Sequence, residues 1–339
     1  MTSMLRRSGS NSGSKSLDHE PSSPAEEQVK VNELRAALGP LTGRAEIYAT
    51  DACLKRYLRA RNWNVKKSEK MLRDTLHWRS VYKPEEIRWA DVAKEHETGK
   101  MYRANFLDKQ GQTILAMHPI RQNTSEMDGH IKHLVYCLEN AILNLPIGQE
   151  QMIWLVDFRG WGIKYTIPIK TAREATNILQ NHYPERLHVA ILFSPPRVFE
   201  AFWMIVKPFL DPKTFRKVKF VYSKNSESMK QLDGLLLKDR LKDIIDNPTD
   251  YNHEEYAKLM EEDDMKSTAY WKIGEGQPQN GDLPDPGSMI KFEDSTESTP
   301  TLHGELSSNT KNTARGNGLG DVSMTKRTRH HKQADPANR

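Results

Sequence analysis

The chain contains little cysteine and no long apolar run. Its only cysteines, Cys53 and Cys137, are too few for a disulfide framework and are not spaced as a metal site, which favours a reducing compartment. The apolar stretches fall well short of the roughly 18 to 20 residues that a membrane-spanning helix needs. The ends carry neither a secretory signal nor a lipidation motif. We therefore expect a cytoplasmic protein whose contact with membranes is peripheral and reversible.

The sequence also lacks the motifs of common enzyme classes. It has no Gly-x-Ser-x-Gly elbow and no glycine-rich phosphate loop. His130 and His133 are three residues apart on a predicted helix, but no cysteine or carboxylate at ligand spacing supports them as a zinc site. Nothing favours His182, Ser194 and Asp157 as a catalytic triad over core and loop roles. We therefore predict no enzymatic activity, no metal and no cofactor.

The composition indicates an ordered middle with polar ends. Only 37% of residues are hydrophobic, while 28% are charged. Residues 1–28 are predicted to be a disordered tail and residues 266–339 a mostly disordered one, because neither has much to bury. A net charge of +5 favours anionic partners such as membrane surfaces without indicating nucleic acid. The basic cluster at 326–332 is either a membrane contact, a localisation signal or a solvated tail.

Between these ends, hydrophobic periodicity predicts alternating helices and strands. Helices are expected within 51–83, where basic residues dominate, and from Met127 to Asn144. Strands are expected at 113–117, 152–156, 189–193 and 217–222. This alternation predicts an α/β fold with right-handed crossovers.

Arg61 is a first candidate for binding chemistry. It follows Leu54 and Leu58 at helical spacing and so lies on the apolar stripe of its helix. A buried guanidinium stays charged and needs a carboxylate or a phosphate as partner. A structural salt bridge or a side chain reaching solvent at the helix end remains an alternative.

The segment from Asp211 to Lys217 is a second candidate. Asp211 followed by proline is typical of a helix start, and Thr214 then falls in the first turn with Lys217 on the same face. A hydroxyl, free backbone amides and an ammonium at one point suit a phosphate. The alternative is an ordinary capped helix with solvated lysines.

A third feature is the strongly apolar helix predicted from Arg197 to Leu210. It carries more large apolar residues than one buried face requires, so it is either wholly internal or in contact with lipid. Its members include Val198, Phe199, Phe202, Trp203, Val206 and Phe209.

Three motifs in this order resemble the CRAL-TRIO lipid-binding domain. They are Tyr57-Leu58-Arg59-Ala60-Arg61, Asn181-His182-Tyr183-Pro184-Glu185-Arg186 and Lys207-Pro208-Phe209-Leu210-Asp211-Pro212-Lys213-Thr214. More narrowly, they resemble phosphatidylinositol/phosphatidylcholine transfer proteins and their plant-type single-domain relatives. The resemblance covers about residues 30 to 265.

The resemblance implies a CRAL-TRIO fold. A small N-terminal helical lobe would occupy 29–95, and a lipid-binding domain at 96–265 would use a mixed sheet as the floor of an apolar pocket. By resemblance, Arg61, Asp108, Thr214 and Lys217 match positions that hold the inositol phosphate headgroup, and Glu185 matches a carboxylate also needed for it. The helix at 197–210 matches the gate that closes the pocket.

The resemblance also implies a function. The chain is expected to bind a phospholipid, phosphatidylinositol above all, as a monomer, and to transfer it between membranes or present it to lipid-modifying enzymes such as lipid kinases. The alternative is a carrier or sensor of an isoprenoid or sterol, or a lipid-regulated scaffold.

Two departures from the family pattern limit what it implies. The family's choline site uses hydroxyl side chains on one strand, whereas this chain has Met152, Ile153 and Trp154 there, so exchange with phosphatidylcholine is not implied. The family's Gly-Gly turn near the gate is replaced by the sequence at 244–252, so gate dynamics are not implied either.

Overall fold

The computed structural model describes residues 21–236, 240, 244 and 251–272. All of them belong to one compact unit, Met1–Glu293; the second unit, Asp294–Arg339, lies outside the described residues. So do most of the predicted tails, including the basic cluster at 326–332, and much of the segment at 244–252. Among the described helices, none is both long and apolar enough to cross a membrane.

The N-terminal helices form a core of their own. They are α1 (Pro24–Leu38), α2 (Arg44–Tyr48), α3 (Asp51–Ala60) and α4 (Val65–Tyr82). The Ser23 side chain accepts a hydrogen bond from the Glu26 amide and Pro24 occupies the first turn, so α1 starts inside the predicted tail of 1–28. That boundary was wrong because a strong helix start precedes the apolar stripe of Val31, Leu34 and Leu38.

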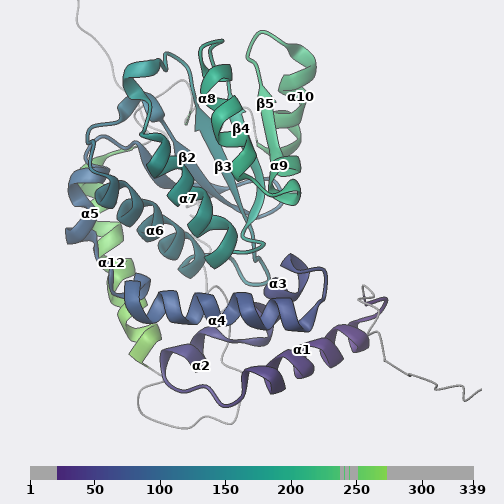
Figure 1. The fold of residues 1–339 in the computed structure, drawn as a ribbon. Coiled ribbons are helices and arrows are strands. Elements are labelled where there is room, and N and C mark those ends of the chain that lie inside the picture. The colour runs from purple at the N-terminus through teal and green to yellow at the C-terminus, as the bar shows by residue number, and fades with distance from the viewer. Residues whose placement is uncertain (1–20, 237–239, 241–243, 245–250, 273–339) are drawn as a thin grey trace, which may run out of the picture. The chain divides into compact units, whose positions relative to one another are not determined.

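A five-stranded mixed sheet forms the centre of the fold (Figure 1). In spatial order its strands are β1 (Met101–Leu107), β2 (Thr113–Met117), β3 (Met152–Asp157), β4 (Leu187–Phe193) and β5 (Val218–Val221). β1 pairs antiparallel with β2 across the turn at Gly111, whose φ is +77°, and the other pairs are parallel. The predicted strands are therefore confirmed, although β5 is shorter than 217–222.

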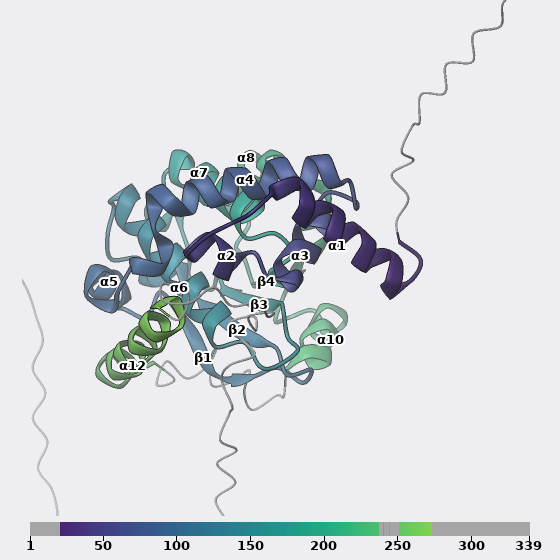
Figure 2. The same ribbon diagram turned by 90° about the horizontal axis from the view of Figure 1, so that it is seen from below.

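Helices cover both faces of the sheet (Figure 2). One face carries α6 (Met127–Leu143), α7 (Ile169–His182) and α8 (Phe199–Val206); the other carries α10 (Ser226–Leu235). Along β3, Trp154 and Val156 face the first layer, whereas Ile153 and Leu155 face the second. The α/β fold with a helical N-terminal lobe is thus confirmed.

Shorter elements connect these layers. They are η1 (Pro84–Glu86), α5 (Trp89–His96), η2 (Pro119–Arg121), η3 (Ile163–Tyr165), η4 (Lys207–Phe209) and α9 (Pro212–Lys217). The final described helix, α12 (His253–Lys272), packs along α5 and α6 and returns to the N-terminal helices. Tyr270 and Trp271 are buried there against Ile47. Because of this contact the folded chain continues past the predicted boundary at 265.

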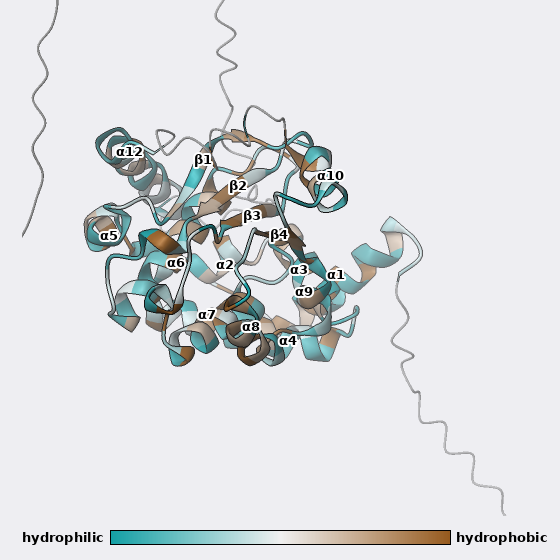
Figure 3. Cartoon of the chain, turned by 90° about the horizontal axis from the view of Figure 1, so that it is seen from above, coloured by the Kyte–Doolittle hydropathy of each residue, from teal (hydrophilic) through white to brown (hydrophobic). Residues whose placement is uncertain are grey.

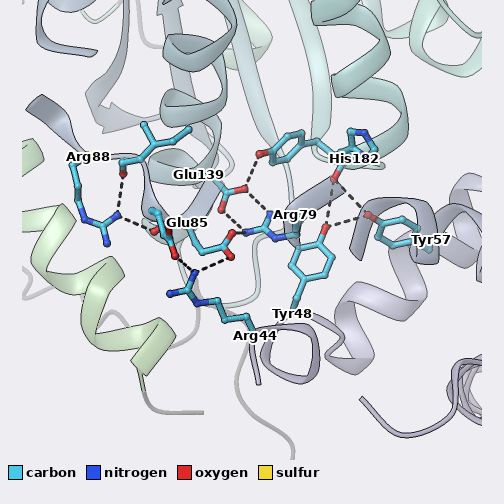
Figure 4. A network of polar contacts seen from close by, with 11 residues as sticks. Arg44, Tyr48, Tyr57, Arg79, Glu85, Arg88, Glu139 and His182 are labelled. Atoms are coloured by element: carbon cyan, nitrogen blue, oxygen red, sulfur yellow. Dashed lines mark hydrogen bonds and ion pairs between the residues drawn. The ribbon is translucent and has the colours of Figure 1, made fainter. Parts of the chain in front are cut away.

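A buried ion network joins the N-terminal helices to the sheet layer (Figure 4). The guanidinium of Arg79 on α4 lies 2.8 Å from Glu139 on α6 and 3.1 Å from Glu85 in η1. The Tyr183 hydroxyl donates to Glu139 at 2.7 Å, and the Arg79 guanidinium also stacks on the Tyr48 ring. Burial favours the neutral carboxyl, but Arg79 outweighs it and lowers the pKa of Glu139. The network therefore holds several elements together as ionised groups.

Candidate functional site

Two neighbouring cavities lie between the sheet and the layer of α6, α7 and α8. One has a volume of about 310 Å³ and the other about 270 Å³. They share wall residues from β2, β3, α7 and α8, namely Met117, Trp154, Val156, Phe158, Leu179 and Phe202. Since these shared walls are apolar, the pair forms a divided hydrophobic chamber, as an apolar ligand requires.

Helix α8 closes the larger cavity. Phe199, Phe202, Trp203 and Val206 line it from this helix. On the outer side of α8, Met204 is 71% exposed and Ile205 is 49% exposed. The helix is thus apolar on both sides, and Figure 3 shows it among the most hydrophobic elements of this view. It therefore resembles neither a buried helix nor an ordinary amphipathic one.

The predicted helix from Arg197 to Leu210 is shorter than expected. α8 spans Phe199–Val206, and a separate 3₁₀ turn, η4, follows at Lys207–Phe209. Pro208 explains the break, because proline has no amide hydrogen to continue the α-helical bonds. Val198 therefore precedes the helix and is 39% exposed, and Phe209 lies in η4; neither lines the cavity.

Polar groups gather at one end of the larger cavity. Arg61, Glu185, Thr214 and Lys217 all line it, although they come from three separate places in the sequence, with Thr214 and Lys217 both on α9. The Lys217 ammonium lies 3.3 Å from the Glu185 carboxylate and donates to the Leu187 carbonyl at 2.7 Å. Four of the five predicted headgroup residues thus line one cavity, and they include charges of both signs.

Asp108 is the exception. It lies in the turn between β1 and β2, where its side chain accepts hydrogen bonds from the amides of Gln110 and Gln112 at 2.9 and 2.6 Å. It does not line either cavity. In this structure Asp108 shapes the hairpin turn, and it is not among the groups that converge near Lys217.

Glu185 occupies a strained backbone position. Its φ is +58°, in the left-handed region that non-glycine residues seldom adopt. The residue sits between the end of α7 and the start of β4, and its carbonyl accepts a hydrogen bond from the Gln151 side chain at 3.2 Å. Such strain persists where neighbouring contacts hold it, and it is frequent at functional sites.

The environment of Thr214 differs from the expectation. Asp211 caps α9 by accepting hydrogen bonds from the Lys213 and Thr214 amides at 2.8 and 2.9 Å, and the Thr214 hydroxyl also donates to it at 2.7 Å. The amides expected to be free for a phosphate are therefore occupied by the cap. What remains for an anion at this end is the hydroxyl oxygen and the nearby cations, not the helix terminus.

Arg61 ends α3 instead of lying within it. Its backbone caps the helix, and its side chain donates to the Ala60 carbonyl at 3.2 Å. Among the described residues no carboxylate pairs with it directly, but its charge contributes to lowering the pKa of Asp211, where hydrogen bonds from Thr214 and Lys213 outweigh the opposing effect of burial. The structural salt bridge considered above is therefore absent from the described part, and Arg61 lines the larger cavity as well as a separate open pocket beside Lys67 and Asp74.

Trp154 stands between the two cavities and lines both. Its buried indole N–H has no hydrogen-bond partner in the described part of the chain, and the same holds for the Thr171 hydroxyl in the smaller cavity. Met152 lines the larger cavity, whereas Ile153 faces the opposite side of the sheet. The sequence showed that Trp154 has no hydroxyl for a choline site. It did not show that its N–H is an unpartnered hydrogen-bond donor, because the direction of a strand side chain becomes evident only in the folded sheet.

The catalytic triad considered in the sequence analysis, of His182, Ser194 and Asp157, does not form in this structure. His182 contacts the Thr75 hydroxyl at 3.1 Å and stacks on Trp78. Asp157 pairs with Arg159 at 2.9 Å, and Ser194 contacts Ser223 at 3.2 Å. Each group therefore has a separate structural partner.

The sequence matches the family model described as CRAL/TRIO domain over residues 96–234, and the one described as CRAL/TRIO, N-terminal domain over residues 26–74. The two matches together cover more than half of the chain.

Two relatives and one solved structure illustrate the similarity. A CRAL-TRIO domain-containing protein of Schizosaccharomyces pombe is 34% identical over 62% of this chain and 20% of its own length. The phosphatidylinositol transfer protein PDR17 of Saccharomyces cerevisiae is 35% identical over 58% of this chain and 59% of its own length. The crystal structure of Sfh5 aligns with 16% identity and a TM-score of 0.49, covering 60% of this chain and 82% of that one. The chain thus spans less than two thirds of these two relatives. By its family matches, the chain belongs to the CRAL/TRIO family.

Proposed function

We propose that this protein binds one phospholipid, a phosphatidylinositol, with its acyl chains in the divided chamber behind α8 and its headgroup near Lys217. It would then transfer the lipid between membranes or present it to a lipid-modifying enzyme such as a lipid kinase. The observation that carries the proposal is that Arg61, Glu185, Thr214 and Lys217 line one cavity, together with the charged residues Arg186, Asp211 and Lys213, while most of its other walls are apolar.

The energetics of lipid transport require both parts of this arrangement. Moving one eighteen-carbon chain from a bilayer into water costs on the order of 14 kcal/mol, so a carrier must offer apolar walls in its place. The residues that line both cavities, Met117 and Phe202 among them, provide such apolar walls. A phosphate that leaves water at the same time needs cationic partners, which Arg61 and Lys217 supply.

Each polar residue has a distinct role in the proposal. The guanidinium of Arg61 and the ammonium of Lys217 are proposed to hold the phosphodiester oxygens, because both residues line the cavity and both carry a positive charge. Glu185 fixes the Lys217 ammonium and accepts hydrogen bonds from inositol hydroxyls. Thr214 adds a hydroxyl whose position is set by Asp211. A neutral isoprenoid or sterol would leave these charges without a ligand partner.

Phosphatidylcholine is proposed to be a poor second ligand. Trp154 fills the space between the two cavities, and neither it nor Met152 supplies a hydroxyl for a choline headgroup. The indole N–H can instead donate to an ester carbonyl of the bound lipid, because it has no partner among the described residues.

The Saccharomyces cerevisiae relative is named a phosphatidylinositol transfer protein, and this name supports the proposed ligand class. We further propose a non-catalytic, monomeric protein that acts in the cytoplasm and touches membranes through the exposed apolar side of α8. Met204 and Ile205 provide that contact.

The direct test is mass spectrometry of lipids retained by the full chain after purification from a eukaryotic host. We expect phosphatidylinositol with little phosphatidylcholine. Lys217→Ala should lose at least tenfold of the bound phosphatidylinositol with an unchanged fold, whereas Lys219→Ala, an exposed lysine two residues away on β5, should retain it. A sterol or isoprenoid as the sole ligand, or equal retention in both variants, would overturn the proposal.

A further inference from the structure

Three side chains with metal-binding chemistry meet outside the headgroup site. His96 is the last residue of α5, and His133 and Cys137 lie on α6. The spacing of four residues places the latter two on one face of the helix. All three are buried, with 0%, 2% and 3% of their surface exposed. Each therefore presents its ligand atom to a dry interior instead of to solvent.

The distances between these ligand atoms are short. The His96 Nε2 atom lies 3.7 Å from the Cys137 sulfur, and one ligand atom from each of the three residues lies within 4.8 Å of the others. The two imidazole rings are 4.1 Å apart and nearly perpendicular. Small side-chain movements would bring all three atoms around one ion of tetrahedral preference.

An unpartnered nitrogen provides an independent sign of a missing ligand. Buried Nε2 of His133 has no hydrogen-bond partner in the described part of the chain. Nδ1 of His96 also lacks one there, but the ring nitrogen of His96 that lies near the Cys137 sulfur is Nε2. Native proteins rarely leave a buried polar atom without a partner, and an ion bound by His133 would supply one.

We propose that His96, His133 and Cys137 bind one Zn²⁺ ion. Imidazole nitrogen and thiolate sulfur are ligands that zinc prefers, and three protein ligands leave one tetrahedral position for water or another donor. His133 also lines the smaller cavity, which gives an ion a path to the site. The proposal does not depend on the proposed lipid, because none of the three residues lies at the headgroup end.

The protonation states of the free cluster fit this chemistry. Burial lowers the pKa of His96 to about 3 and that of His133 well below its ordinary value, so both imidazoles are neutral ligands. Burial raises the pKa of Cys137, which keeps the free thiol protonated. Binding therefore forms a zinc–sulfur bond, breaks the sulfur–hydrogen bond and releases one proton to solvent.

The surroundings contribute one nearby cation and a largely apolar shell. Lys100 is the closest positive charge, and its ammonium is paired with Glu95. The rings of Trp89, Tyr136 and Tyr256 pack around His96 and exclude water. His253 and His130 are the other titratable groups whose charges reach the cluster. Such a shell strengthens metal–ligand bonds once the ion has entered.

The histidine pair considered in the sequence differs from the cluster in the structure. His130 is held by hydrogen bonds to Gln122 and Thr124 and is not part of the cluster. The useful signal was the spacing from His133 to Cys137, but His96 joins them only because α5 packs against α6. The prediction of no metal site thus rested on spacing along one helix.

The test is a titration of the full chain, without an affinity tag, with Co²⁺ in place of Zn²⁺. We expect one Co²⁺ per chain with a thiolate-to-cobalt charge-transfer absorption that Zn²⁺ abolishes. Cys137→Ala should remove this absorption and weaken Zn²⁺ binding at least 100-fold. Cys53→Ala, the other buried free cysteine, is the matched control and should leave both unchanged.

Several outcomes would overturn the site. They are the absence of charge-transfer absorption, its persistence in Cys137→Ala, or its loss in Cys53→Ala. Binding without this absorption would indicate nitrogen ligands alone, such as His330 and His331, and a variant lacking both histidines would then lose it. If Cys137→Ala does not fold by circular dichroism, His96→Asn replaces it. Zinc content of the wild-type chain gives a measurement that needs no variant.

Discussion

The Lys217 ammonium lies 3.3 Å from the Glu185 carboxylate, although 32 residues separate them in the sequence. The pair is partly exposed, with 27% and 19% of the side-chain surfaces accessible, so its contribution to stability is small. Both residues line the larger cavity and Glu185 has a left-handed backbone, which fits the proposed role in binding.

A conservative change at Glu185 should separate binding from stability. Glu185→Gln removes the charge but keeps the size, so we expect at least a tenfold loss of phosphatidylinositol transfer between vesicles and a change in unfolding free energy below about 1 kcal/mol. Glu185→Gly should lose transfer equally but be no less stable than Glu185→Gln, because glycine adopts a φ of +58° without strain. Transfer at the wild-type rate in either variant would contradict the role of the carboxylate.

Replacing Trp154 should change ligand choice. Trp154→Ser removes the wall between the two cavities and adds a hydroxyl, so we expect phosphatidylcholine to rise from a trace to an amount comparable with phosphatidylinositol. Trp154→Phe keeps most of the bulk and serves as the control. Lipid mass spectrometry of both purified variants measures the result, and an unchanged lipid profile in Trp154→Ser would show that this wall does not select the headgroup.

The ion network at Arg79 should be essential for stability. Arg79→Met leaves the largely buried Glu139 carboxylate and the buried Glu85 carboxylate without this cation, so we expect a loss of about 3–5 kcal/mol in unfolding free energy by chemical denaturation. Lys230→Met removes an exposed ion pair with Glu227 and should cost less than about 1 kcal/mol. Equal effects of the two changes would mean that the network adds no more than a surface pair.

His182 should make stability dependent on pH. Burial, followed by the charge of Arg79, lowers its pKa to about 4. The unfolded chain therefore binds a proton near pH 6.5 that the folded chain takes up only near pH 4, so stability is full above pH 6.5 and is lost as the pH falls towards 4.

Because the ring is partly exposed, we expect a slope of at most about 1 kcal/mol per pH unit, measured by denaturation between pH 4 and 7. His182→Gln should reduce this slope without abolishing it, because burial also lowers the pKa values of His96 and His133. His77→Gln, which changes an exposed histidine of α4, should leave the slope unchanged. A slope of the wild-type size in His182→Gln would assign the effect to other groups.

The strands, the mixed α/β class and the helices around Arg61 were predictable because apolar periodicity records which residues face a core. It was harder to predict which distant residues meet in the fold, because nothing in the local sequence around Glu185 places it beside Lys217. The resemblance to a family supplied that link, yet it also suggested Asp108, which lies in a hairpin turn instead.

Other features depend on long-range packing. The extension of α12 to Lys272 follows from the contact of Trp271 with Ile47, more than 200 residues apart. The expected free amides at Thr214 were wrong because the same Asp211 that starts the helix also satisfies them. Periodicity identifies a helix start, but it does not indicate whether its amides remain available.

The two apolar sides of α8 make its position depend on the medium around it. In water, covering the chamber keeps Phe202 and Trp203 out of solvent, which favours the observed position of α8. In hydrocarbon this preference would vanish, because the outer side with Met204 and the inner side are both apolar. Under the proposed function, a change of the surrounding medium would therefore be enough to move the helix, without a chemical trigger.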